Sequence, residues 1–82
     1  MGAQYAPKMT DSAIWNELQA LLANRDTEQV RFDKMFRKMQ QAKTYDQQWE
    51  YEQRVNSIDG LLTLIDNRIC ELRNEIEKRV NK

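Results

Sequence analysis

The amino-acid sequence predicts an all-α fold, an antiparallel hairpin of two long helices. Apolar residues recur every three or four positions through both halves of the chain, which is the period of an amphipathic helix. A helix-capping pattern, Thr44 followed three residues later by Gln47, separates the two halves. The two repeats are nearly equal in length, about 50 Å each at 1.5 Å per residue, so the second can run back along the first.

Residues 1–9 show no helical period and contain the single proline, Pro7. We expect them to form a loose, flexible N-terminal arm. Thr10, Asp11 and Ser12 are three consecutive candidates for a helix N-cap, because their short polar side chains can accept hydrogen bonds from the first free backbone amides. The first helix is therefore expected to cover about residues 11–43.

A first apolar seam runs along residues 11–43 in steps of four and three, and its middle is polar at Arg25 and Glu28. Two interpretations remain open at that point. Either the helix continues through a polar layer, or residues 24–27 form a joint at which Asp26 and Gln29 cap a new helix. Since no glycine or proline marks a stop there, continuity is favoured. The apolar members of the seam are Ile14, Leu18, Leu21, Phe32, Met35, Met39 and Ala42.

A tight turn is expected at residues 43–46, where Lys43 suits a helix C-terminus and Asp46 suits an N-terminus. The second helix then covers about residues 46–80. Its heptad seam is unbroken and requires a partner helix along its whole length. The seam consists of Tyr51, Val55, Ile58, Leu62, Ile65, Ile69, Leu72 and Ile76.

One register aligns both seams, from Ile14 facing Ile76 to Met39 facing Tyr51, and the two residue numbers of each facing pair sum to 90. The net charges of the two segments that face each other also favour this register. Residues 31–43 carry five basic side chains and one acidic, whereas residues 46–59 carry four acidic and one basic.

At the positions that flank the seam, the same register brings like charges together. Lys38 falls near Arg54, and Glu17 near Glu75. Each such pair costs about 0.2–0.5 kcal/mol.

Apolar side chains also lie beside the seams, which is typical of a helix that touches more than one neighbour. On the first helix they form a stripe whose fourth position is Gln29, and the second helix adds two leucines. We expect these side chains to form a protein interface, either between two hairpins in a four-helix bundle or with the helices of another protein. The candidate interface residues are Trp15, Leu22, Phe36, Leu61 and Leu64.

Composition disfavours several classes of function. The chain has no histidine and one cysteine, Cys70, so an intrachain disulfide or a thiolate–imidazole metal site is excluded. No catalytic residues are predicted, because the sequence contains no glycine-rich phosphate loop and no nucleophile with a plausible base. We expect no cofactor, no metal, no membrane partner and a cytoplasmic location. No run of apolar residues approaches the roughly 20 that a membrane helix needs.

A basic ridge on the first helix supports an alternative function, that of a small dimeric nucleic-acid-binding or regulatory protein. The ridge consists of Arg31, Lys34, Arg37 and Lys38. Against it stands the overall charge balance of 13 basic and 13 acidic side chains, because nucleic-acid-binding domains usually carry a basic excess.

The leading hypothesis is a non-enzymatic protein–protein interaction module, an adaptor or co-chaperone that self-associates or docks on a partner's helices. In length and in its two amphipathic helices the chain resembles small helical-hairpin chaperones and co-chaperones of bacterial secretion systems, and also small helical proteins of phages and plasmids. No sequence motif is specific enough to assign a functional residue of either group to a position in this chain.

Overall fold

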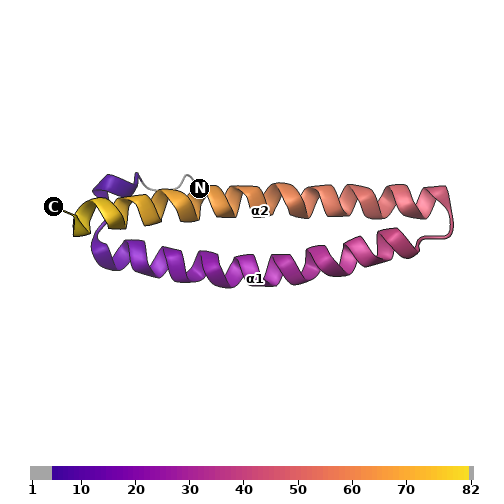
Figure 1. Ribbon diagram of the computed structural model, residues 1–82, viewed down its shortest axis with the longest axis horizontal. Coiled ribbons are helices and arrows are strands. Elements are labelled where there is room, and N and C mark those ends of the chain that lie inside the picture. The colour runs from indigo at the N-terminus through magenta and orange to yellow at the C-terminus, as the bar shows by residue number, and fades with distance from the viewer. Residues whose placement is uncertain (1–4, 82) are drawn as a thin grey trace.

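The computed structural model describes residues 5–81 and confirms the all-α helical hairpin. A short 3₁₀ turn, η1 (Ala6–Lys8), precedes two long helices, α1 (Asp11–Gln41) and α2 (Tyr45–Val80). The helices lie antiparallel in a rod of 57 × 20 × 17 Å, with η1, the start of α1 and the end of α2 at one end (Figure 1). We call this the terminal end, and the opposite one the turn end.

Threonine side chains cap both helices. The Oγ1 of Thr10 accepts a hydrogen bond from the amide of Ala13 (3.1 Å), and the Oγ1 of Thr44 accepts one from Gln47 (3.2 Å). The cap at Thr44 was expected, but the turn lies slightly earlier in the chain than predicted and spans residues 42–44. α1 ends at Gln41 and α2 begins at Tyr45, because Ala42 and Thr44 already have extended backbone.

α1 is continuous through residues 24–27, as the absence of glycine and proline indicated. The polar layer is satisfied by ion pairs. Arg25 pairs with Asp66 of α2 (3.0 Å), and Glu28 pairs with Arg31 one turn along its own helix (3.0 Å). A break is therefore not needed to accommodate these charges.

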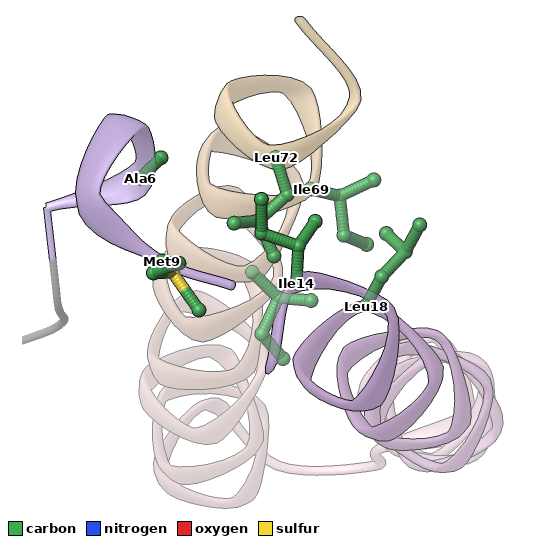
Figure 2. Packing of buried hydrophobic residues seen from close by; sticks show 7 residues of the cluster. Ala6, Met9, Ile14, Leu18, Ile69 and Leu72 are labelled. Atoms are coloured by element: carbon green, nitrogen blue, oxygen red, sulfur yellow. The ribbon is translucent and has the colours of Figure 1, made fainter. Parts of the chain in front are cut away.

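The best-packed part of the hydrophobic core lies at the terminal end (Figure 2). Within α1 the buried side chains are Ile14 and Leu18, and Ile14 is 1 % exposed. Farther toward the turn, α1 contributes half-buried residues such as Phe32 and Met35. α2 is buried along more of its length, at Val55, Ile58, Leu62, Ile65, Ile69 and Leu72.

Two interhelical ion pairs agree with the predicted register. Arg79 pairs with Asp11, whose numbers sum to 90, and Arg25 pairs with Asp66, whose numbers sum to 91. The facing residues of the two seams therefore lie at the same level along the rod.

The expected like-charge contacts are relieved by opposite charges nearby. Glu17 pairs with Arg68 (2.8 Å), Glu75 with Arg79 (3.0 Å), and Arg54 with Glu50 (3.2 Å). These ion pairs offset the repulsion, because long arginine side chains can reach a carboxylate one turn away, as Arg54 and Arg79 do, or on the other helix, as Arg68 does.

Residues 5–9 differ from the loose arm that the sequence predicted, whereas residues 1–4 lie outside the described part. Ala6 and Met9 are 2 % and 8 % exposed and belong to the same core as Ile14 (Figure 2). The turn is closed by hydrogen bonds from the amide of Lys8 to the carbonyl of Tyr5 (2.9 Å) and from Met9 to Ala6 (3.1 Å).

Two arginines of α2 hold this arm. The guanidinium of Arg79 donates to the carbonyl oxygens of Ala6 (3.2 Å), Pro7 (3.4 Å) and Met9 (2.6 Å), and it also pairs with two carboxylates. The hydrogen bonds to the carboxylates of Asp11 and Glu75 raise the pKa of Arg79 above its ordinary value.

The second arginine, Arg68, lies within 3.5 Å of the sulfur of Met9. Burial lowers its pKa, but hydrogen bonds with Glu17 and Glu71 more than compensate, so that the net shift is upward. Both anchors of the arm are therefore permanently charged.

Replacing Ile69 with Asp is expected to unfold the hairpin. Ile69 is 3 % exposed, and an unpaired carboxylate at that site costs about 4 kcal/mol or more, which is comparable with the whole stability of a domain of this size. Circular dichroism will show loss of helicity. Val30→Asp is the control, since Val30 is 67 % exposed, and a variant Ile69→Asp that stays fully helical would contradict the core assignment.

Replacing Arg79 with Ala is expected to free the arm without melting the helices. The amide of Met9 should then exchange its hydrogen roughly ten-fold faster or more, because its hydrogen-bonded turn is no longer held against α2. Hydrogen exchange measured by NMR reports this directly, with Arg73→Ala as the control at an exposed arginine of the same helix. Unchanged exchange at Met9 would show that apolar packing alone retains the arm.

Candidate protein-interaction site

The hairpin presents two opposite sides, one on each flank of the seam. In an antiparallel pair, equivalent flanking positions of the two helices meet on the same side, because one helix is reversed. Residues 15, 22, 29 and 36 of α1 therefore share a side with residues 52, 59, 66, 73 and 80 of α2, of which Arg73 is basic. Residues 17, 24, 31 and 38 share the other side with residues 54, 61, 68 and 75.

Contacts in the structure agree with this division. On the first side, Arg25 reaches Asp66, and Trp15 and Val80 line one depression of about 200 Å³. On the second side, Glu17 reaches Arg68. We call the first side the acidic face and the second the basic face, for the reasons that follow.

The acidic face carries the apolar stripe of α1. Trp15 is 51 % exposed and Phe36 38 % exposed, while Leu22 is half-buried against the core. The ring of Phe36 stacks on Phe32, with 6.0 Å between centroids and 10° between planes, which fixes the direction of this exposed ring. Carboxylates flank the stripe at Asp26, Asp33, Glu52, Asp59 and Asp66.

The basic face carries the two leucines of α2. Leu61 is 42 % exposed and Leu64 67 % exposed. Toward the turn end, Arg31 and Arg54 flank an open groove of about 410 Å³ that also contains Met35. The remaining residues of this groove are Gln53, Ser57 and Ile58.

The arm covers the terminal end of the basic face. Residues Tyr5, Ala6 and Pro7 border a shallow hollow together with Glu71 and Glu75 of α2. The exposed part of the basic face therefore begins near Leu64 and extends to the turn.

The predicted interface residues do not form one patch. The structure places Trp15, Leu22 and Phe36 on the acidic face, whereas Leu61 and Leu64 lie on the basic face. An interface that buries all five must involve both sides of the hairpin.

The predicted basic ridge is divided as well. Arg31 is paired with Glu28, and Lys34 and Lys38 are exposed on the basic face. Arg37 lies at the outermost position of α1, away from α2, because it follows the seam residue Met35 by two positions. Arg54, which sequence reasoning did not include in the ridge, joins Arg31 across the groove, and its flanking heptad position was the available signal.

Gly60 and Cys70 are two further exposed positions on α2. The added Cβ of an alanine at Gly60 would meet no atom within 4 Å, and the thiol of Cys70 is exposed. Within residues 5–81, no cluster of histidine, cysteine and carboxylate side chains is arranged to hold a metal ion. Neither helix contains a stretch that is both long and apolar enough to cross a membrane.

Comparison with protein families, with curated proteins and with solved structures finds no match to this chain.

Proposed function

We propose that this chain is a non-enzymatic protein-interaction module, a helical hairpin that binds other helices, with a second copy of itself as the favoured partner. The observation that carries the proposal is the set of large apolar side chains that the hairpin's own core leaves exposed. Trp15, Phe36, Leu61 and Leu64 are 38–67 % exposed although each lies on a regular, well-capped helix.

Burial of these side chains supplies the driving force. Complete burial of a large apolar side chain stabilises a protein by about 1.5–3 kcal/mol. The four side chains are only partly buried in a single hairpin. The free energy gained by completing their burial is an appreciable share of the stability of a domain this small. On α1 these side chains are aligned along one flank of the seam, which is typical of a helix that touches more than one neighbour.

The shape supports binding to a helix rather than chemistry. The apolar stripe follows the axis of α1, from Trp15 through Leu22 to Phe36, at the seven-residue spacing that a helical partner can match. Adaptor and co-chaperone roles both require a surface of this kind. The choice between them is a question of which partner is bound.

Replacing Phe36 with Ser is expected to weaken self-association roughly ten-fold or more while leaving helicity nearly unchanged, since the ring lies outside the main core cluster. Light scattering after size-exclusion chromatography measures the mass, and circular dichroism measures the helicity. Val30→Ser is the matched control, because Val30 is exposed on the outer side of the same helix. A large loss of helicity in Phe36→Ser would instead make Phe36 a core residue.

Nucleic-acid binding is the second candidate, favoured by the two arginines that flank the groove of the basic face. In that case Lys34→Glu combined with Lys38→Glu should abolish binding to a duplex oligonucleotide, whereas Phe36→Ser should leave it unchanged. Binding should also weaken steeply with salt, because phosphate contacts release counterions. Fluorescence anisotropy at two salt concentrations tests this, and no binding at low salt would eliminate the candidate.

A further inference from the structure

The two faces of the hairpin are complementary in charge. Between residues 26 and 66, the acidic face carries five carboxylates and one lysine, Lys43, and one of the carboxylates, Asp66, pairs with Arg25. Over the same residues the basic face carries four basic side chains and one carboxylate, Glu50. The four basic residues are Arg31, Lys34, Lys38 and Arg54.

Each face also carries exposed apolar side chains. Phe36 lies on the acidic face, and Leu61 and Leu64 lie on the basic face. A symmetric dimer formed through the acidic faces leaves both leucines in water, and it brings carboxylates together when the two rods point the same way. One formed through the basic faces leaves Phe36 exposed, and in the same orientation it opposes Arg31 and Arg54 to their copies. Neither arrangement buries both sets.

We propose that the acidic face of one copy docks on the basic face of the next, so that the hairpins stack side by side in an open series. This inference rests on the proposed function and identifies its partner as a second copy of the chain. Because the two surfaces of such a contact differ, the arrangement is heterologous and does not close at a dimer. Opposite charges meet at every contact, and both apolar sets are covered.

Charge also sets the direction of the stack. The carboxylates and the basic side chains both lie in the half of the rod nearer the turn, as the register shows. They meet only when neighbouring hairpins point the same way. In this orientation Trp15 of one copy lies level with Glu75, and therefore with the arm of its neighbour, where Tyr5 is 65 % exposed.

Two variants that each block one face test the proposal. Phe36→Lys places a cation on the acidic face, and Leu64→Asp places a carboxylate on the basic face, so each should repel the next copy. Sedimentation velocity of the full chain should give a mass that grows with concentration for the parent and a monomer of 9.8 kDa for each variant alone. An equimolar mixture of the two variants should form a dimer and grow no further.

A second pair of variants keeps every apolar side chain, so that a loss of association in this pair is not explained by misfolding. Asp59→Lys and Lys34→Glu change exposed charges on opposite faces and should behave as the first pair does. Raising the salt concentration should weaken the parent's association, because surface charges are screened.

Other outcomes overturn the proposal in distinguishable ways. A variant blocked on one face that still forms a dimer by itself would show a symmetric contact through the other face. A parent that stays monomeric at every concentration would eliminate self-association but leave the interaction module intact, provided that a foreign helical partner binds it and Phe36→Ser weakens that binding. Absence of both would contradict the proposed function itself.

Discussion

The structure depends on the packing of Ile14 and Leu18 of α1 against Ile65, Ile69 and Leu72 of α2 at the terminal end. This cluster contains the most completely buried side chains, and it fixes the register of the two helices. In this register Arg25 of the polar layer lies close enough to Asp66 to form an ion pair. The register also determines which charged residues lie on each of the two faces. Toward the turn, α1 contributes half-buried rather than fully buried side chains, so the hairpin is less tightly packed there.

The sequence predicted the helices and their register well. Periodicity and capping depend on residues that are close together in the sequence, and the alignment of the two seams combines many such positions. The packing of residues 5–9 was missed. It depends on Arg79, which donates hydrogen bonds to backbone carbonyls about 70 residues away. Arg79 follows Ile76 by three positions on the seam of α2, but a charged residue there gives no apolar signal. Whether the five candidate residues form an interface stays a prediction. Trp15, Phe36, Leu61 and Leu64 are exposed, but reversal of α2 places the two leucines on the side opposite Phe36, a consequence of the register that composition does not reveal.

Exposed apolar residues and asymmetric charge together distinguish this hairpin from a simple two-helix coiled coil. In a coiled coil the residues beside the seam are commonly charged and face water. Here the flanks combine aromatic and aliphatic side chains with carboxylates on one side and basic groups on the other. The arm covers the terminal end of the basic face, so the exposed part of that face lies in the middle and at the turn end of the rod.

Amide hydrogen exchange along the whole chain, at a low and a high protein concentration, tests the central claim most directly. The amides around Ile14, Leu18 and residues 65–72 should be strongly protected at both concentrations, since their packing is internal to one hairpin. The amides of residues 29–39 and 50–64 should exchange faster in dilute solution and gain protection as the concentration rises. Uniform protection that does not depend on concentration would contradict the claim that the turn half of the hairpin is an interaction surface.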